Sequence, residues 1–230
     1  MSERGRILKY IEMCQIEGLS LQKGMNFCPQ RDHSIFLMSL RRDAPYRDRI
    51  EDGGQTLIYE GHDASRTQSA PAPKLIDQPS KLPSGSLTEN GKFFEAANHF
   101  KSGGSARSVR VYEKLRDGVW ADNGSFDLVD AWKETAGIRQ VFKFKLLVTN
   151  GAAPPGAMTE SGFVRARMIP SAVKQEVWLR DGGKCTLCDA ADELHFDHII
   201  PFTKGGSSLV ASNIQLLCAR HNLKKSDKIE

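Results

Sequence analysis

Short apolar runs, separated by turns that contain glycine, make up most of the first two thirds of the chain. Residues 34–40, 56–59, 108–112 and 140–148 are rich in β-branched and aromatic side chains, as strands usually are. Apolar and polar residues alternate in the last two of these runs, which is typical of strands with one buried face. The pattern predicts a curled, mainly β structure before about residue 150.

Helical periodicity predicts two helices. Residues 88–100 place Phe93 and Ala97 on one apolar stripe, and two glycines follow the stripe. A second helix is predicted from Ser171, a good N-cap residue, to about Arg180.

The segment after the second helix is predicted to be short and irregular. A strand is expected over residues 194–200, a turn over residues 204–208, and mixed loop and helix over residues 211–225.

Two stretches rich in proline and glycine interrupt the pattern. Residues 65–85 contain four prolines and predict a long loop, and residues 149–162 have little apolar periodicity and mark a domain boundary. We therefore expect an α+β protein with a domain over residues 1–150, a linker over residues 151–168 and a small domain over residues 169–230.

Charge and hydropathy narrow the classes of function only moderately. The net charge is +4 and the sequence pI is about 8.8, which permits a polyanionic partner such as DNA without requiring one. The sequence contains no apolar run of membrane-span length and no signal-peptide pattern at Met1–Leu8. We expect a cytoplasmic protein of a bacterial or phage-type host, with no membrane partner.

Two chelating pairs near the end of the sequence predict a zinc site. Cys185 and Cys188 are three residues apart, as are Cys218 and His221. Three thiolates and one imidazole suit a tetrahedral structural Zn²⁺, which would stabilise a domain too small for a large core. The alternatives are that the pairs are unrelated turns, or that His221 has a catalytic role.

The residues between and after the two pairs carry a second pattern. His195-Phe-Asp197-His198-Ile-Ile-Pro is followed by Lys-Gly-Gly-Ser, by Asn213 in an apolar run, and by Asn222 directly after the second pair. This order resembles the HNH endonuclease family of restriction enzymes over about residues 169–230. The family has a zinc-stapled ββα-metal fold.

The resemblance implies a role for each polar residue. His198 would be the general base, Asp197 and Asn222 would bind a catalytic Mg²⁺ or Mn²⁺, and Asn213 would orient His198 through the loop backbone. Asn222 stands where the family name has histidine, so the metal preference can differ. The expected catalytic set consists of Asp197, His198, Asn213 and Asn222. His195 is either a supporting residue or a merely structural one.

A weaker resemblance covers about residues 30–147. Tyr46, Asp48, Tyr59 and Glu60 lie around a turn in the order of the SRA (YDG) domain, a curled, β-barrel-like module related to the PUA fold that flips a modified cytosine into a pocket. The resemblance implies that Tyr46 and Tyr59 stack on the base and that Asp48, with Glu60 nearby, accepts its amine. Glu60 stands where a small hydroxyl residue is common. The alternative is that both tyrosines simply pack in a β core.

Together the two resemblances imply a modification-dependent DNA endonuclease. It would bind double-stranded DNA containing 5-methylcytosine or 5-hydroxymethylcytosine and cut phosphodiester bonds as a homodimer. Two alternatives stay open: an HNH nuclease of the homing or phage type, directed by sequence or DNA structure, and a non-catalytic DNA-binding protein with a structural zinc.

Overall fold

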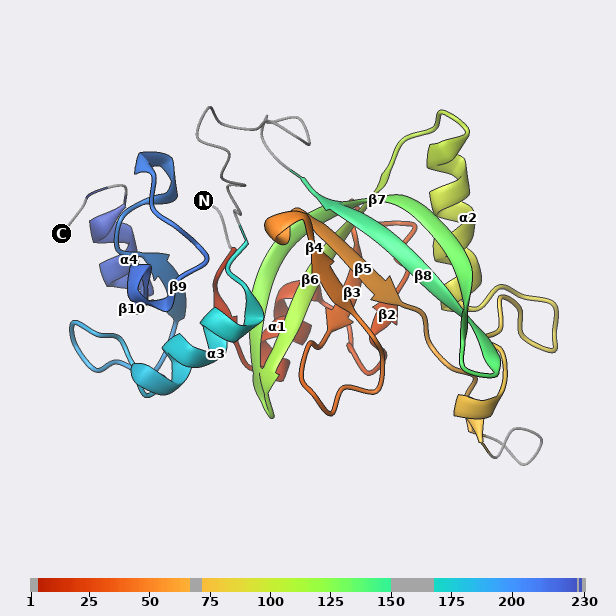
Figure 1. The fold of residues 1–230 in the computed structure, drawn as a ribbon, viewed down its shortest axis with the longest axis horizontal. Coiled ribbons are helices and arrows are strands. Elements are labelled where there is room, and N and C mark those ends of the chain that lie inside the picture. The colour runs from red at the N-terminus through yellow and green to blue at the C-terminus, as the bar shows by residue number, and fades with distance from the viewer. Residues whose placement is uncertain (1–3, 67–71, 150–167, 227, 229–230) are drawn as a thin grey trace.

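The computed structural model describes residues 4–66, 72–149, 168–226 and 228. Within these ranges the chain forms a sheet domain (residues 4–149) and a C-terminal module (residues 168–226). Figure 1 shows the C-terminal module at one end of the long axis and helix α2 at the other. None of the described helices is long and apolar enough to cross a membrane. The predicted linker, residues 151–168, lies outside the described residues except for Met168.

The sheet domain is built on one eight-stranded sheet. Its strands run along the path β2-β3-β6-β7-β8-β5-β4, with β1 paired to β7. All pairs are antiparallel except β3 with β6. The strands are β1 (Ile7–Leu8), β2 (Met25–Asn26), β3 (Ser34–Met38), β4 (Arg49–Glu51), β5 (Thr56–Glu60), β6 (Arg107–Arg116), β7 (Val119–Ala136) and β8 (Arg139–Val148).

The predicted α+β class is confirmed, and the sheet is curled but open, because its path ends at β2 and at β4 in the described part of the chain. Figure 1 shows β7 and β8 bending over the other strands. Long strands that bend in this way often carry bulges. The pairing of β7 shifts register against both neighbours, between Arg110 and Tyr112 of β6 and between its own Leu128 and Asp130.

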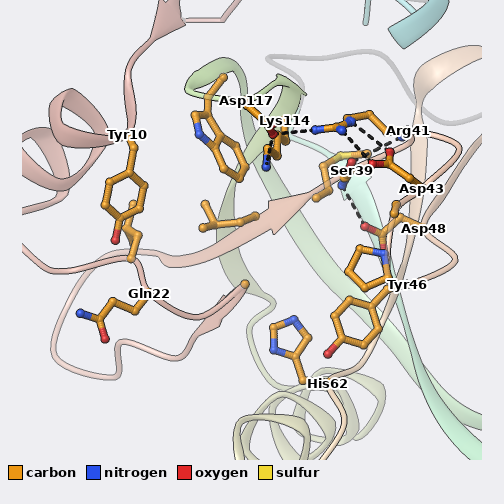
Figure 2. A pocket seen from close by; sticks show the side chains of 17 residues that line it. Tyr10, Gln22, Ser39, Arg41, Asp43, Tyr46, Asp48, His62, Lys114 and Asp117 are labelled. Carbon is orange, nitrogen blue, oxygen red and sulfur yellow. Dashed lines mark hydrogen bonds and ion pairs between the residues drawn. The ribbon is translucent and has the colours of Figure 1, made fainter. Parts of the chain in front are cut away.

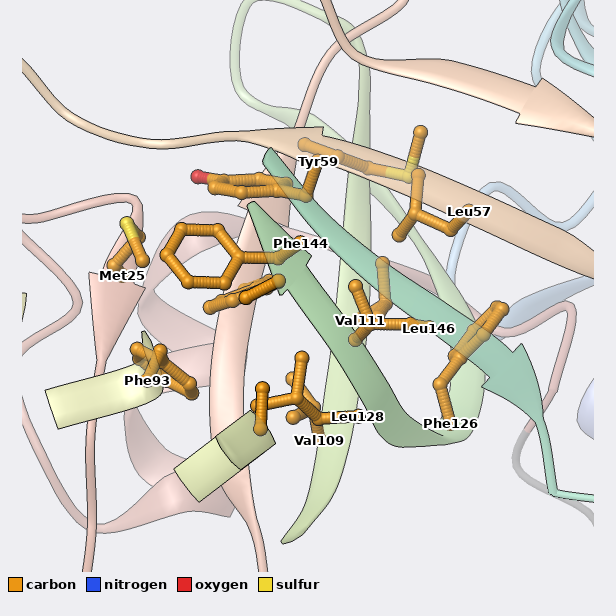
Figure 3. Close-up of a cluster of buried hydrophobic side chains, with 14 of the residues drawn as sticks. Met25, Leu57, Tyr59, Phe93, Val109, Val111, Phe126, Leu128, Phe144 and Leu146 are labelled. Carbon is orange, nitrogen blue, oxygen red and sulfur yellow. The ribbon is translucent and has the colours of Figure 1, made fainter. Parts of the chain in front are cut away.

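Helix α2 (Glu89–Lys101) closes one face of the sheet domain over an aromatic core. Thr88 caps the helix, its Oγ accepting a hydrogen bond from the Gly91 N–H at 3.2 Å. Phe93 of α2 packs against Phe36 of β3, with ring centroids 4.5 Å apart, and Figure 3 shows it beneath Phe144 and Tyr59. The helix predicted over residues 88–100 is confirmed.

The C-terminal module consists of two helices and a two-stranded antiparallel sheet. The elements are α3 (Ser171–Arg180), β9 (Leu194–His198), β10 (Ile214–Cys218) and α4 (Ala219–Lys225). The helix predicted after Ser171 is confirmed, but Ser171 is not its N-cap. Pro170 holds that position, and the Ser171 hydroxyl donates instead to the Glu113 carboxylate of β6.

A short N-terminal segment joins the two sheets. Residues 5–8, here called the N-terminal strap, pair through β1 with β7, and the Phe196 N–H of β9 donates to the Gly5 carbonyl at 2.9 Å. Arg6 and His195 form an antiparallel bridge beside this bond. Helix α1 (Tyr10–Glu17) follows the strap. The backbone of β9 is thus hydrogen-bonded to the sheet domain.

A buried ion pair forms a second junction between the two parts. Lys174 of α3 donates from Nζ to Glu113 Oε2 at 2.6 Å and to Asn123 Oδ1 of β7 at 2.6 Å. The side chains of Lys174 and Glu113 are 2% and 1% exposed. Around them, Leu115 and Ala121 of the sheet domain share a hydrophobic cluster with residues of the C-terminal module. The two parts therefore pack as one body through polar and apolar contacts.

Lys174→Met is expected to destabilise the protein by about 3–5 kcal/mol at pH 7, because it leaves the Glu113 carboxylate buried without its cation. Burial acts to raise the pKa of Glu113, but Lys174 and the surrounding hydrogen bonds hold it below its ordinary value of 4.5. A lowered folded-state pKa stabilises the protein above the unfolded pKa, and this contribution is lost as pH falls below it.

Urea unfolding at pH 7 and at decreasing pH tests this expectation. The stability gap between the natural protein and Lys174→Met should narrow as pH falls through 4.5. Lys184→Met removes an exposed lysine and should change the free energy of unfolding little. A gap that is absent at pH 7 would contradict the role of the ion pair.

Candidate functional site

Four side chains of the C-terminal module meet in a cluster of metal-ligand geometry. The donor atoms of Cys185, Cys188, Cys218 and His221 all lie within 4.8 Å of one another. His221 Nδ1 is 3.4 Å from the sulfur atoms of both Cys185 and Cys218, and the Cys188 and Cys218 sulfurs are 3.9 Å apart. A tetrahedral Zn²⁺ with about 2.3 Å bonds to sulfur and about 2.0 Å to nitrogen would place its ligands about 3.5–3.8 Å apart.

The chemistry of the four donors also fits zinc. Burial acts to raise the pKa of the Cys185 thiol, but backbone hydrogen bonds at Cys218 and Leu187 and the His221 side chain lower it to about 6. The thiolate form is the one that binds metal. A closed set of four soft and borderline ligands is typical of a structural site, so the cluster is suited to hold the module together.

Two residues of the cluster lie at the start of α4. Cys218 ends β10 and is the N-cap residue of α4, and His221 lies in the first turn of that helix. His221 therefore points into the zinc cluster, which favours the ligand interpretation over a catalytic role for this histidine.

Asp197 and His198 lie at the end of β9, as the sequence predicts. Lys225 of α4 reaches both: its Nζ is 2.9 Å from Asp197 Oδ2 and 2.6 Å from the His198 carbonyl oxygen, to which it donates. The Lys225 side chain is 1% exposed. The sequence alone does not single out Lys225, because nothing in its spacing distinguishes a buried lysine from an exposed one.

The environment of His198 keeps its imidazole neutral. Burial lowers the pKa of His198, and Lys225 lowers it further, while Asp197 acts in the opposite direction. The Nε2 atom lies 2.8 Å from the Ser208 hydroxyl. A neutral, fixed imidazole has the form needed to accept a proton from water near neutral pH.

Asn213 connects the two sides of the loop that follows His198. Its Oδ1 accepts from the Ile200 N–H at 2.9 Å, and its Nδ2 donates to the carbonyls of Ile200 and Ser207 at 3.2 and 3.0 Å. The side chain is thus engaged entirely with loop backbone, which is the arrangement expected of a residue that orients His198 indirectly.

Asn222 and Lys225 are three residues apart on α4, so they lie on the same face of the helix. Because Lys225 contacts Asp197, this face is turned toward β9. A carboxylate and an amide oxygen are hard donors that suit Mg²⁺ or Mn²⁺. The donor types at Asp197 and Asn222 therefore fit a catalytic divalent ion.

A cavity of about 670 Å³ lies in the sheet domain, away from β9. Figure 2 shows Tyr46 and His62 side by side along its wall, with Asp48 nearby and Tyr10 opposite. The Tyr46 and His62 rings are stacked, with centroids 4.8 Å apart and planes 10° apart. Burial lowers the pKa of His62 to about 4, so its ring is neutral. Sequence reasoning missed His62, which lies three residues beyond Tyr59.

Asp48 is held at the cavity by the ends of two strands. Its oxygens accept from the backbone N–H groups of Glu60 and Ser39 at 3.0 and 3.2 Å. Burial raises the pKa of Asp48 to about 7, although these hydrogen bonds act to lower it. The group can therefore exchange a proton near neutral pH and can act as a hydrogen-bond acceptor or donor.

Tyr59 and Glu60 do not line this cavity. Tyr59 is buried, stacks on Phe36 at 4.2 Å and shares a 3.0 Å hydrogen bond with His62 Nε2. Glu60 is also buried and pairs with Lys143 at 2.8 Å. The structure thus brings Tyr46 and Asp48 together at the cavity and places Tyr59 and Glu60 behind them.

Zinc removal is expected to unfold the C-terminal module, because its two-stranded sheet is small and the cluster closes it. Cys218→Ser should abolish zinc binding and lower the melting temperature, as measured by metal analysis and thermal unfolding. Cys28→Ser changes a thiol outside the cluster and should leave the zinc content unchanged. Equal zinc content in both variants would contradict the assignment.

Comparison with known families identifies one segment of the chain. Residues 185–228 match the model of the HNH endonuclease family. This range contains the zinc cluster and the side chains of Asp197, His198, Asn213 and Asn222. No curated protein sequence matches the chain.

Several solved structures are similar to larger parts of the chain. The SUVH5 SRA domain in complex with methylated CHH DNA is 21% identical with a TM-score of 0.46, covering 66% of this chain and 92% of that one. The same domain bound to hydroxymethylated CG DNA is 20% identical with a TM-score of 0.43, covering 64% and 88%. The modification-dependent TagI restriction endonuclease is 19% identical with a TM-score of 0.43, covering 96% and 76%. Residues 185–228 are thus similar to HNH endonucleases, and about two thirds of the chain is similar in structure to an SRA domain.

Proposed function

We propose that the protein is a modification-dependent DNA endonuclease, which reads a modified cytosine in the sheet domain and cuts with the C-terminal module. The observation that carries the proposal is the grouping of Asp197, neutral His198 and Asn213 at one strand end, inside the segment that matches the HNH family. The cavity beside Tyr46 supports the reading step.

In the cutting step, His198 accepts a proton from the attacking water, which forms a new P–O bond as the bond to the leaving oxygen breaks. Asn213 holds the loop that carries His198. Asp197 and Asn222 would hold the Mg²⁺ or Mn²⁺, whose chemistry is to polarise the phosphate and neutralise charge on the leaving oxygen. Lys225 keeps Asp197 in place from the helix side.

In the reading step, 5-methylcytosine or 5-hydroxymethylcytosine is turned out of the duplex into the cavity. His62 stacks on the Tyr46 ring and Lys74 Nζ lies 4.1 Å from its centroid, so a base that stacks on Tyr46 would do so in place of one of these groups. Asp48 also lines the cavity and would bond the polar edge of the base. Tyr59 would support Tyr46 indirectly, because it hydrogen-bonds His62, which stacks on Tyr46. Glu60 would support Asp48 through its backbone N–H, which donates to the Asp48 carboxylate. The roles given to Tyr59 and Glu60 are thus indirect.

The described part of each chain contains one proposed cutting site, so we expect two chains to act together when both DNA strands are cut. A symmetric homodimer is the simplest assembly that supplies them. We therefore expect double-strand cleavage to rise more steeply than linearly with protein concentration.

His198→Ala is expected to lower the cleavage rate by about a hundredfold to ten-thousandfold, because the variant loses its general base. DNA binding measured by gel shift should be retained. His99→Ala changes an exposed histidine of α2 and serves as the control. Full activity of His198→Ala would rule out the proposed cutting step.

Modified DNA is expected to be the preferred substrate. One plasmid is prepared unmodified, 5-methylated and 5-hydroxymethylated, and its cleavage is followed with Mg²⁺ and with Mn²⁺. Tyr46→Ala should weaken binding of modified DNA by about fivefold to 150-fold, since aromatic stacking on a base contributes about 1–3 kcal/mol. Tyr46→Phe keeps the ring and should bind nearly as well as the natural protein.

Equal cleavage of all three plasmids, with His198→Ala inactive, would keep the nuclease and reject the reading of modified cytosine. In that case recognition of a plain sequence or of a DNA structure would be the better account of the sheet domain.

A further inference from the structure

We infer that the N-terminal strap and the Lys174–Glu113 pair are positioning elements, which fix the cut at a constant distance from the base that is read. The inference rests on the proposed function. It adds that the packing of the sheet domain against the C-terminal module sets the position of the cut relative to the modified base. The segment that connects the two parts in sequence does not set it.

The strap links the cavity wall to strand β9, which carries Asp197 and His198, by backbone hydrogen bonds. At one end, Leu8 pairs in register with Trp120, and Trp120 lines the cavity. At the other end, the Gly5 carbonyl accepts from the Phe196 N–H at 2.9 Å, and Phe196 directly precedes Asp197. A few residues of paired backbone therefore separate the two sites.

The strap is itself fixed to the sheet at the point where it meets β9. The Gly5 N–H donates to the Asp122 carbonyl, and the Asp122 N–H donates to the Arg6 carbonyl, both at 2.8 Å. Gly5 has a φ of +89° and leaves no room on its β9 side: a Cβ there would lie 2.9 Å from the Phe196 oxygen. This contact requires glycine.

Helix α3 forms an independent second link. Near its start, Lys174 is bonded to Glu113 of β6 and to Asn123 of β7. At its end, Arg180 donates to the carbonyls of Ala211 and Ile214 at 2.8 and 2.7 Å, on both sides of Asn213. The helix thus connects the sheet domain to the loop that orients His198.

Two links at different points restrict rotation as well as separation. A module tethered by a flexible chain would sample many phosphates, and its cuts would spread over several positions. A module held at two points presents His198 to one place on a DNA duplex whose modified base occupies the cavity. The expected product is therefore a single dominant cut position on each strand.

The test uses a duplex with one modified cytosine at a known position, with the ends of the products mapped by sequencing. The natural full-length protein should give one dominant cut position per strand. Gly5→Ala should spread the cuts over neighbouring phosphates and reduce the share of the dominant position severalfold, while cleavage still depends on the modification.

Gly103→Ala is the matched control. Gly103 has a φ of +92°, close to that of Gly5, but nothing lies within 4 Å of an added Cβ. Both variants carry the same left-handed backbone cost, and only Gly5→Ala disturbs β9. Lys174→Met, checked for folding by zinc content, tests the second link and should broaden the cuts in the same way.

Scattered cuts by the natural protein on modified DNA would overturn the inference while leaving the proposed function intact. An unchanged dominant position in both Gly5→Ala and Lys174→Met would also overturn it. Cleavage that ignores the modification altogether would instead reject the proposed function, so the two failures are distinguishable.

Discussion

Cys218 and His221 lie where β10 turns into α4, and the arrangement of the side chains around Asp197 and His198 depends on how these two residues are held. A two-stranded sheet is marginal by itself in water. The zinc cluster ties this turn to Cys185 and Cys188, which follow α3 in the chain. With the start of α4 fixed, its later residues face β9, so a zinc ion held by this cluster would also define the geometry around Asp197.

Two buried lysines form ion pairs at places where the orientation of a side chain or of the two parts of the protein must be defined. Lys225 pairs with Asp197, Lys174 with Glu113, and both lysines are nearly inaccessible to solvent. A buried ion pair often contributes little net stability compared with an apolar pair of the same volume. Its directional hydrogen bonds, however, accept only one arrangement of the groups around them. Here the two pairs orient the Asp197 carboxylate and the junction between the two parts.

Much of the C-terminal module could be predicted from the sequence, because its chemistry is encoded in short spacings. Chelating cysteines and histidines must lie a few residues apart, and the zinc cluster forms from the residues that the spacing indicates. Asn213 likewise bonds the loop backbone, as expected. The prediction of Ser171 as an N-cap was wrong because its hydroxyl has a distant partner, Glu113, that no local pattern reveals.

The sheet domain was harder to predict for the same reason. The long strand β7 contains Asp122 and Asn123, polar residues that disfavour a buried strand unless their side chains have hydrogen-bond partners. These partners are Arg110 on β6 and Lys174 on α3. The sequence pattern around Tyr59 is compatible with a side chain in a cavity wall and with one in the hydrophobic core. In the structure Tyr59 stacks on Phe36 and belongs to the core. Most features of the fold and of the site that could not be predicted depend on contacts between residues far apart in sequence.

The contact between Gly5 and Phe196 joins residues 191 positions apart in the sequence (196 − 5), and this separation has a consequence for the order of events on the ribosome. Domains that are synthesised first generally fold first. The sheet domain, with its strap already paired to β7, is therefore available as a finished template before β9 emerges. The strand that carries Asp197 and His198 pairs with β10 and with that template, so in a newly made chain the cavity of the sheet domain forms before this strand is in place.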